Sequence, residues 1–92
     1  MPDLAQNTVH LRRIDPSQNM RRFYCLTLQP TLFGGASVIR EWGRIGTRGQ
    51  SMMETFDQVI DAEQLLKRQL QRKIQRGYRV PQGGTVTRPN PR

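Results

Sequence analysis

The sequence predicts an α+β fold, in which an antiparallel β-sheet of four or five strands carries one C-terminal amphipathic helix across one face. Two observations predict it. Up to residue 56, short runs with an apolar period of two alternate with Gly- and Pro-containing turns, as in a strand meander. From residue 57, apolar residues recur every three or four positions, as in a helix. This pattern fits one domain over residues 8–80, between a flexible start (1–7) and a disordered, Pro- and Gly-rich tail (81–92).

Four segments have the residue pattern of strands. They are Thr8–Asp15, Arg21–Gln29, Ser37–Ile45 and Gln50–Phe56. The second segment is the clearest, because Tyr24, Leu26 and Leu28 share one face of a chain with a side-chain period of two.

Turn-forming residues separate these segments. The turns are "PSQN" at residues 16–19, a connection with a Gly pair at 34–35, and "GTRG" at 46–49. The glycines of the last turn allow the positive φ angles that a tight hairpin requires.

One amphipathic helix is predicted from Asp57 to just before Gly77. Its apolar stripe has steps of three, four, four and four and consists of Val59, Ala62, Leu66, Leu70 and Ile74. Asp57 is the expected N-cap, and Gly77 is the expected residue just beyond the helix. Leu66 and Leu70 are central in the stripe, so we expect them to hold the helix to the sheet.

The net charge of +8 in 92 residues favours a polyanionic partner, with nucleic acid ahead of an anionic membrane surface. Charge alone does not distinguish DNA from RNA. No apolar run approaches the roughly 18–20 residues of a membrane span. The N-terminal segment lacks the layout of a signal peptide. A single cysteine excludes an internal disulfide, so the expected location is the cytoplasm.

Residues for catalysis or metal binding are nearly absent from the chain. The only histidine is His10 and the only cysteine is Cys25, so neither a nucleophile pair nor a zinc cluster is predicted. We expect His10 to be an ordinary strand residue and Cys25 a small core residue. The glycines at 43, 46 and 49 match neither a dinucleotide fingerprint nor a phosphate-binding loop. The sequence therefore predicts a protein that is not an enzyme and uses no cofactor.

The second half of the helix is strongly basic. Residues 64–79 contain six basic side chains and no acidic one. Arg68, Arg72 and Arg76 form one stripe about 12 Å long, which suits contact with phosphates or, alternatively, is only a solvated face. Lys73 lies on the apolar side, so its stem should run along the sheet and carry the ammonium to the rim, unless it only fills space there.

The stretch "REWGRIGTRGQ" (40–50) contains the only tryptophan. The alternation of side chains does not decide whether Trp42 is a core residue or a half-exposed ring at the end of a strand. An exposed ring could stack on a sugar or base, while Gly43 admits another backbone and Arg44 offers a planar guanidinium. Arg40 and Arg48 add positive charge to the same stretch.

These residues resemble the WGR domain family, named for its Trp-Gly-Arg sequence. The resemblance rests on "WGRIG" followed by "GQ", on "NMRRFYCLTLQPTLFGG", and on Phe56, Lys73 and the Gly77-Tyr78 pair; it covers Asn19 to Tyr78. It implies a sheet with one packed helix, in a module known chiefly from DNA-damage-responsive poly-ADP-ribose polymerases that binds DNA at strand breaks. It also implies that Trp42 packs against a terminal sugar and that Arg44 contacts DNA or a neighbouring domain. No catalytic domain accompanies the motif, so transferase activity does not carry over.

The sequence therefore predicts a non-catalytic nucleic-acid-binding module that binds DNA ends or strand breaks. One alternative is a protein–protein adaptor whose Trp-Gly-Arg face docks a partner, supported by Ile45 and Trp42 beside the small Gly43. An RNA-binding module is the other alternative. The predicted site residues are Trp42, Gly43, Arg44, Arg40, Arg48, Arg68, Arg72, Lys73 and Arg76.

Overall fold

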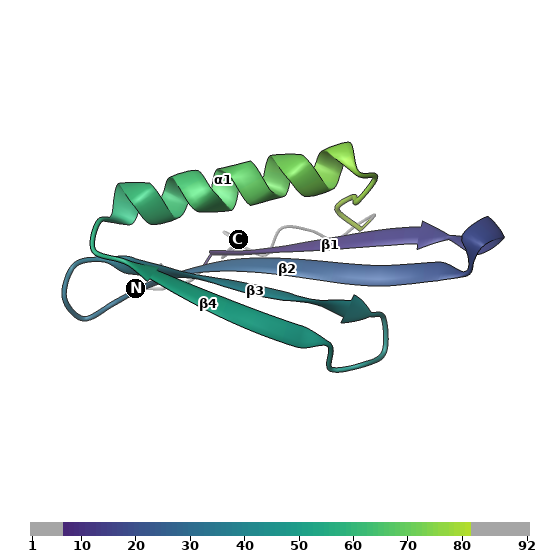
Figure 1. Ribbon diagram of the computed structural model, residues 1–92, viewed down its shortest axis with the longest axis horizontal. Coiled ribbons are helices and arrows are strands. Elements are labelled where there is room, and N and C mark those ends of the chain that lie inside the picture. The colour runs from purple at the N-terminus through teal and green to yellow at the C-terminus, as the bar shows by residue number, and fades with distance from the viewer. Residues whose placement is uncertain (1–6, 82–92) are drawn as a thin grey trace, which may run out of the picture.

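The four strands of the sheet lie side by side in their order along the chain (Figure 1). The computed structural model describes residues 7–81. Its strands are β1 (Asn7–Asp15), β2 (Met20–Pro30), β3 (Ala36–Arg44) and β4 (Gln50–Phe56). A 3₁₀ turn, η2 (Pro16–Gln18), joins β1 to β2, and the helix α1 (Val59–Gln75) follows β4. All neighbouring strands are antiparallel, so the predicted α+β fold is confirmed, with four strands.

The bounds of the strands follow the predicted segments closely. β4 agrees at both ends, and the other three strands differ from the prediction by single residues at their ends. β1 begins at Asn7, the last residue of the predicted flexible start. The rest of that start, and the predicted tail beyond Pro81, lie outside the described residues.

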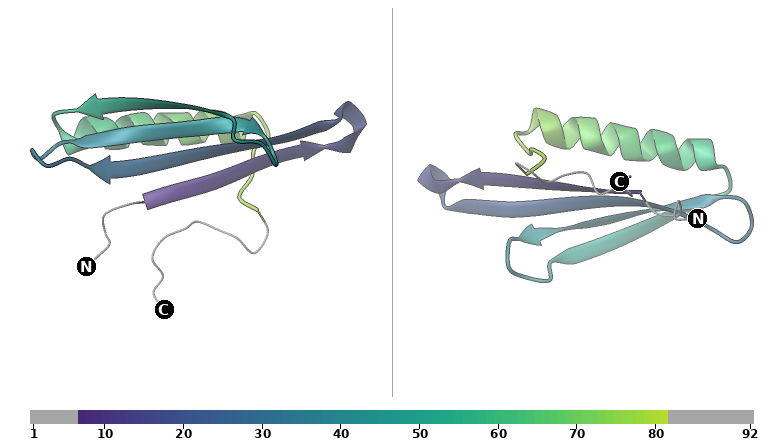
Figure 2. Two further views of the ribbon diagram at one scale, coloured as in Figure 1. Left: turned by 90° about the horizontal axis from the view of Figure 1, so that it is seen from below. Right: turned by 180° about the vertical axis from the view of Figure 1, so that it is seen from behind.

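The helix lies across one face of the sheet, and no described element covers the other face (Figures 1 and 2). Directly opposed residues of antiparallel strands share a face, so the register decides which side chains lie under α1. Tyr24 of β2 is opposite Leu11 of β1 and Trp42 of β3. Tyr24 belongs to the core beneath the helix, so Trp42 also points to the helix side.

The core is small and is built from both layers. Its buried side chains come from β1, β2, β3, α1 and the residue that follows the helix turn: Leu11, Tyr24, Leu26, Ala36, Val38, Ala62, Leu65 and Tyr78. β4 contributes only the partly buried Phe56 and is otherwise exposed along its length. The sheet therefore depends on β2 and β3 for most of its contact with the helix.

The apolar stripe of α1 differs from the predicted one. The two buried helix residues are Ala62 and Leu65, and Leu65 was not in the predicted stripe. Leu66 and Leu70 are only half-buried, while Ile74 is 50% exposed. Successive steps of four rotate by about 40° around a helix of 3.6 residues per turn, so a stripe extended by such steps leaves the sheet before Ile74. A face that stays on the sheet must mix steps of three and four.

The ends of the helix follow the prediction at one end only. Gln58, without a side-chain hydrogen bond, is the N-cap, so the prediction of Asp57 was wrong. At the other end, the Gly77 N–H donates to the Ile74 carbonyl and the Tyr78 N–H donates to the Lys73 carbonyl, each at 3.0 Å. With Gly77 at φ +99°, this is a Schellman turn, as predicted for that glycine. The turn brings Tyr78 back onto the core beside Lys73.

Replacing Leu65 by Ala should lower the free energy of unfolding by about 2–4 kcal/mol, because a buried side chain under the helix is lost. Replacing Ile74 by Ala should change it by less than about 0.5 kcal/mol, because that side chain is half exposed. Both substitutions remove an aliphatic side chain from the same helix, and urea denaturation followed by circular dichroism measures the difference. Equal losses would contradict the helix orientation described above.

Candidate nucleic-acid interface

The Trp-Gly-Arg sequence ends β3 and enters a hairpin in which two backbone segments meet. A Cβ atom on Gly43 would lie 2.7 Å from the Cα atom of Gly49, and a Cβ atom on Gly49 would overlap the carbonyl oxygen of Trp42. Only glycine at both positions permits this approach. Thr47 closes the hairpin by donating from its N–H and its hydroxyl to the carbonyl of Arg44, at 3.0 and 2.7 Å. The hairpin therefore fixes the backbone that carries the Trp42 ring.

Trp42 is half-buried on the helix side of the sheet. Its ring lies 6.5 Å from that of Tyr24, centroid to centroid, at an interplanar angle of 33°. It packs against the core without belonging to the fully buried set. The ring lies against the sheet, because β2 places Tyr24 directly opposite it. Trp42 is therefore neither a fully buried core residue nor a fully exposed ring.

Two adjoining cavities open beside this ring. The larger, of about 450 Å³, is lined by residues from the start of β2, the end of β3 and the end of α1: Gln18, Asn19, Met20, Arg21, Arg22, Tyr24, Trp42, Gly43, Arg44, Lys73 and Tyr78. The smaller, of about 200 Å³, is lined by Tyr24, Arg40, Trp42, Gln69 and Lys73. Tyr24, Trp42 and Lys73 line both. We call the two cavities together the Trp42 groove.

Lys73 projects over the floor of the Trp42 groove. Its Nζ lies 4.5 Å from the centre of the Tyr24 ring and 5.5 Å from that of Tyr78. The sequence predicted this course of the side chain along the apolar side, and the half-buried position of Lys73 agrees with it. The Schellman turn accounts for the contact with Tyr78, because it brings the second residue after the helix back to the last turn.

The charge around Lys73 is uniformly positive. Desolvation, followed by the guanidinium groups of Arg76, Arg40, Arg22 and Arg72, lowers the pKa of Lys73 from its ordinary value. The two tyrosine rings act in the opposite direction, because their faces favour a cation. The groove is thus a place where positive charge is concentrated.

Arginines also line up across the strands at the same end of the sheet. Arg13 of β1 is opposite Arg22 of β2, which is opposite Arg44 of β3. Like charges directly opposite one another destabilise a sheet. The one ion pair among residues 7–81 is between Arg40 and Glu54, at 3.3 Å, so no arginine of this row forms an ion pair with a described carboxylate, although Asp15 lies close enough for the charge of Arg13 to help lower its pKa. A bound anion would remove the repulsion.

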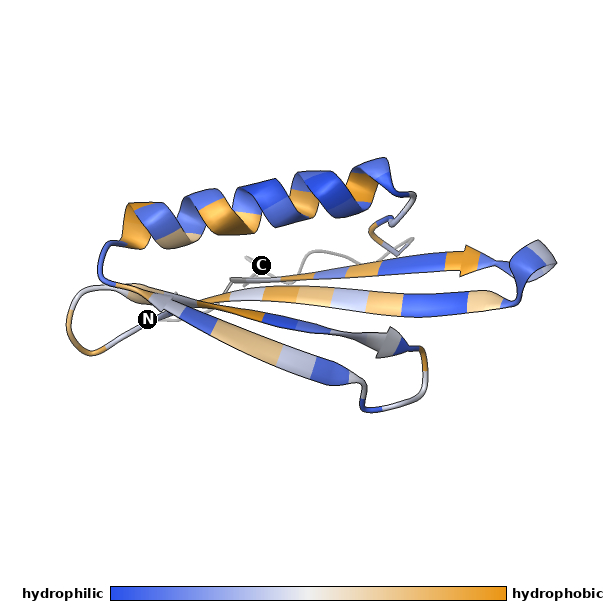
Figure 3. Cartoon of the chain, in the orientation of Figure 1, coloured by the Kyte–Doolittle hydropathy of each residue, from blue (hydrophilic) through white to orange (hydrophobic). Residues whose placement is uncertain are grey.

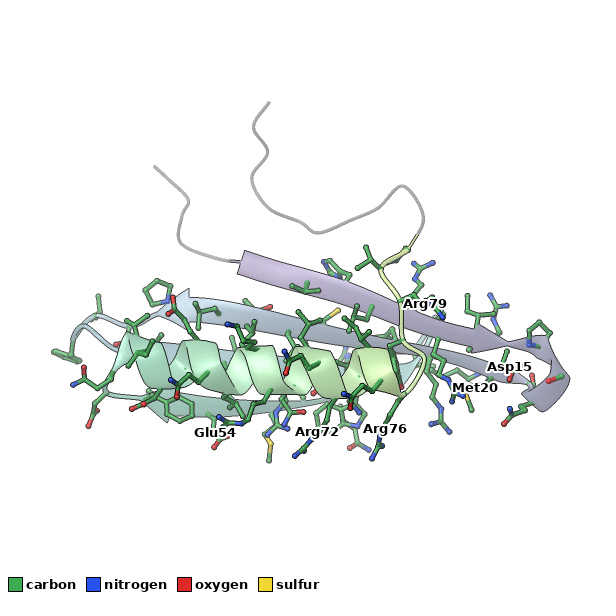
Figure 4. All side chains as sticks on the ribbon, turned by 90° about the horizontal axis from the view of Figure 1, so that it is seen from above. Asp15, Met20, Glu54, Arg72, Arg76 and Arg79 are labelled. Atoms are coloured by element: carbon green, nitrogen blue, oxygen red, sulfur yellow. The ribbon has the colours of Figure 1, made fainter. Side chains whose placement is uncertain are left out.

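The remaining predicted site residues lie at different distances from the groove. Arg40 lines the smaller cavity, although its guanidinium is also bonded to Glu54 and to the Met52 sulfur. Arg72 and Arg76 line neither cavity but project from one side of α1 (Figure 4), close enough to Lys73 to lower its pKa.

Arg68 and Arg48 are exposed and line neither cavity. Seven of the nine predicted residues therefore line or flank one groove: Trp42, Gly43, Arg44, Arg40, Lys73, Arg72 and Arg76.

The sequence did not indicate the other residues that line the groove as part of the site, and four of them show why. Arg22 and Tyr24 share a face by the period of two, which the sequence shows, but their place opposite Arg44 and Trp42 depends on a register that it does not show. Tyr78 lines the groove because the turn after α1 places it there. Asn19 enters through its left-handed backbone (φ 52°) and accepts a hydrogen bond at its carbonyl from the Arg44 guanidinium, at 3.4 Å.

Outside the groove, one pair of reactive side chains lies on the uncovered face. His10 Nδ1 is 3.1 Å from Cys25 Sγ, and Cys25 is half-buried there, so its prediction as a core residue was wrong. Burial, followed by the charge of Glu41, raises the pKa of the Cys25 thiol, which disfavours the nucleophilic thiolate. Within residues 7–81, no cluster of three or more acidic, His or Cys side chains is placed to bind a metal. In the same range, no helix is long and apolar enough to cross a membrane.

The sheet, its single helix and the basic groove at the Trp-Gly-Arg hairpin define a small α+β binding module. The chain belongs to the WGR domain family, whose sequence model matches residues 7–85. That module is non-catalytic, and membership is consistent with nucleic-acid binding. No solved structure matches the chain.

A similar protein occurs in Sinorhizobium fredii, where it is called "Uncharacterized protein y4dW". It is 46% identical over 71 residues, which cover 77% of this chain and 35% of that protein. This chain thus spans about a third of the length of its relative. The relative shares the domain and carries further sequence beyond it.

Replacing Gly49 by Ala should destabilise the domain more than replacing Gly46 by Ala. Both residues have a positive φ, 73° and 95°, so each substitution costs about 1–2 kcal/mol for a left-handed backbone. Only at Gly49 does the new Cβ also collide with the Trp42 carbonyl, whereas nothing lies within 4 Å of a Cβ at Gly46. Thermal denaturation measures the difference, and the fluorescence of Trp42 should shift only in the Gly49 variant. Equal melting temperatures would contradict the backbone contact.

Proposed function

We propose that this domain is a non-catalytic module that binds DNA ends or strand breaks in the Trp42 groove. The observation that carries the proposal is the convergence of an aromatic ring and several cations on one groove. Trp42, Arg44 and Lys73, which the sequence indicates independently of the fold, all line the larger cavity. Family membership supports the same class of function.

The charge of the groove supports a polyanionic partner. Arg22, Arg44 and Lys73 line the larger cavity, and Arg72 and Arg76 flank it from the helix. None of these five residues forms an ion pair with a carboxylate among residues 7–81. Guanidinium groups match the geometry of phosphate oxygens and can bond to two of them at once. A nucleic-acid backbone presents such phosphates at regular intervals, which suits several cations along one groove.

The shape of the groove supports a preference for ends over the interior of a duplex. Charge attracts every backbone phosphate equally and cannot by itself select an end. The larger cavity, of about 450 Å³, lies within the range of sites that take small molecules, roughly 300–1,000 Å³. A paired and stacked nucleotide cannot enter such a cavity unless it leaves the stack, whereas a terminal nucleotide is already exposed on one side. The accessible part of the Trp42 ring then provides a surface for its sugar or base.

Removing charge from the groove should reduce the salt dependence of DNA binding. If about three phosphates are neutralised, the slope of log K against log salt should be about −3. The variant Arg44→Gln/Arg72→Gln/Arg76→Gln should have a clearly flatter slope, measured by fluorescence anisotropy with a labelled duplex at several salt concentrations.

The matched control is Arg12→Gln/Arg48→Gln/Arg68→Gln. It removes the same net charge from exposed residues that line neither cavity of the groove. Its slope should stay near that of the unmodified protein. If both variants flattened the slope equally, binding would be governed by the overall charge and not by the groove.

Replacing Trp42 by Leu should weaken binding to blunt or nicked DNA about tenfold or more, because base–aromatic stacking contributes roughly 1–3 kcal/mol per base. Binding to closed circular duplex should change little. Leu keeps apolar volume against Tyr24, and Trp42→Phe, which keeps a ring, should retain most of the end preference. Competition between linear, nicked and circular DNA, with RNA duplex as a further competitor, measures these differences. A Leu variant that is folded, by circular dichroism, and keeps its end preference would rule out the stacking role.

A protein–protein adaptor is a second candidate, favoured by an observation at the other end of the molecule. Leu32 and Phe33, in the loop between β2 and β3, are 93% and 94% exposed. Ile60, near the start of α1, is 55% exposed. Figure 3 shows apolar residues in that loop and at the start of the helix. Large apolar side chains exposed together often mark an interaction surface. Such a surface is compatible with a nucleic-acid role for the groove, because the two lie at opposite ends of the sheet.

A further inference from the structure

Lys73 has an environment that phosphate binding alone does not require. A lysine that serves only as a phosphate ligand can lie in water at the rim of a surface. Lys73 instead lines both cavities of the Trp42 groove, with its Nζ 4.5 Å from the centre of the Tyr24 ring. The one ion pair among residues 7–81 joins Arg40 to Glu54, so no described carboxylate pairs with Lys73. Burial raises the pKa of Tyr24, so the neighbouring hydroxyl stays neutral as well.

This environment makes the ammonium of Lys73 easier to deprotonate than that of a free lysine. Four guanidinium groups surround Lys73, and its stem is partly withdrawn from water; both effects lower the pKa of Lys73. Desolvation and neighbouring cations are the two ways in which proteins make a lysine nucleophilic toward carbonyl compounds. An arginine cannot serve in this way, because its guanidinium stays protonated. The groove thus combines one amine suited to attack with several permanent cations suited to hold a phosphate.

We propose that Lys73 forms a reversible imine with an aldehyde on a phosphate-bearing sugar, such as the ring-opened deoxyribose of an abasic site in DNA. The proposal rests on the proposed function in that DNA binding would bring the aldehyde to the groove. It extends that function from non-covalent recognition to covalent capture, and it gives the lysine a role distinct from that of the arginines.

The residues around Lys73 fit this substrate. Arg22 and Arg44 line the same cavity and can hold the phosphate next to the sugar. An abasic sugar carries no base, so it needs less room beside the rings of Tyr24 and Trp42 than a complete nucleotide does. The cations would also repel free cationic amines and metal ions, which leaves anionic aldehydes as the favoured class.

The bonding changes are balanced without an oxidant or a reductant. The ammonium of Lys73 first gives a proton to solvent, and the free electron pair of Nζ then attacks the aldehyde carbon. A C–N bond forms as the π bond of the carbonyl opens, and one of the two protons on nitrogen is transferred to the carbonyl oxygen, which gives a carbinolamine. Loss of the remaining proton on nitrogen and of the hydroxyl, together one water molecule, yields the C=N bond. Hydrolysis of the imine regenerates Lys73 and the unchanged aldehyde. The reaction therefore binds the sugar covalently without converting it to a product.

The small number of amines in this chain allows a direct test. The sequence contains only two lysines, Lys67 and Lys73, and the N-terminal amine is the remaining candidate. The full chain is incubated with DNA containing one abasic site and reduced with cyanoborohydride, which fixes any imine as a stable amine. Mass spectrometry then locates the adduct. DNA with a tetrahydrofuran analogue, which has no aldehyde, is the blank, and 2-deoxyribose 5-phosphate is the small substrate.

We expect the adduct at Lys73 with both aldehydes and none with the tetrahydrofuran analogue. Lys73→Arg, which keeps the charge, should reduce trapping at least about tenfold, because a guanidinium is not a nucleophile. Lys67→Arg, on the exposed side of the same helix, is the matched control and should trap as the unmodified protein does. Equal trapping at Lys67 or at the N-terminus, or undiminished trapping in Lys73→Arg, would overturn the proposal.

The two substrates separate this inference from the proposed function. 2-Deoxyribose 5-phosphate needs no DNA binding to reach the groove. If it is trapped at Lys73 while DNA ends show no preferential binding, the imine chemistry holds and the proposed function fails. If DNA ends bind preferentially while neither aldehyde is trapped at Lys73, the proposed function holds and this inference fails.

Discussion

The groove lies where α1 ends before β2, the longest strand that it covers, has ended. α1 has 17 residues and spans about 25 Å, whereas β2 has 11 residues and spans about 36 Å. One end of the β1–β2 hairpin therefore extends beyond the helix, as Figure 1 shows. The Schellman turn closes the helix at this boundary and places Tyr78 on the sheet. Beyond this turn β2 carries Arg22, and the last turn of α1 carries Lys73. The groove therefore forms where α1 stops covering the sheet.

This arrangement keeps positive charges close together, and the fold must tolerate the repulsion. The cross-strand row from Arg13 through Arg22 to Arg44 and the arginines around Lys73 all oppose folding, because like charges are brought together. A core of eight buried apolar side chains has little stability to spare. The charges lie at the edge of that core and not within it. At the edge, water still reaches most of them. Such clustering of like charges lowers the stability of the free protein, and any anion that bound there would raise it.

The sequence was sufficient for the elements and insufficient for their rotation and register. The strands follow from a period of two and from glycines that permit tight turns, and both signals are local. The rotation of α1 was misjudged because Ile74 continues a run of apolar steps of four, while the contacts with the sheet select Leu65 and the half-buried Leu66. Which helix residues face the sheet depends on the side chains of the sheet, which lie far away in the sequence.

The candidate site likewise contains residues that the local sequence indicates and residues that only contacts between elements bring in. Arg44, Lys73 and Trp42 were evident as unusual residues in their own segments. Tyr24 and Arg22 became part of the site only through pairing between strands, which is set by the length and closure of the connecting loop. The half-buried state of Trp42 has the same origin, because the ring opposite it is supplied by β2. Local sequence thus identifies the chemical groups, and pairing between segments decides which groups meet.

The loop that carries Leu32 and Phe33 lies at the opposite end of the sheet from the Trp-Gly-Arg hairpin (Figure 1). A partner held by this loop would leave the groove unobstructed. Two weak contacts made simultaneously reinforce one another, since the first raises the effective concentration for the second, to the millimolar range for short connections. A domain with both contacts would hold two ligands at a distance set by the length of the sheet. Neither the loop nor the groove would then need high affinity alone.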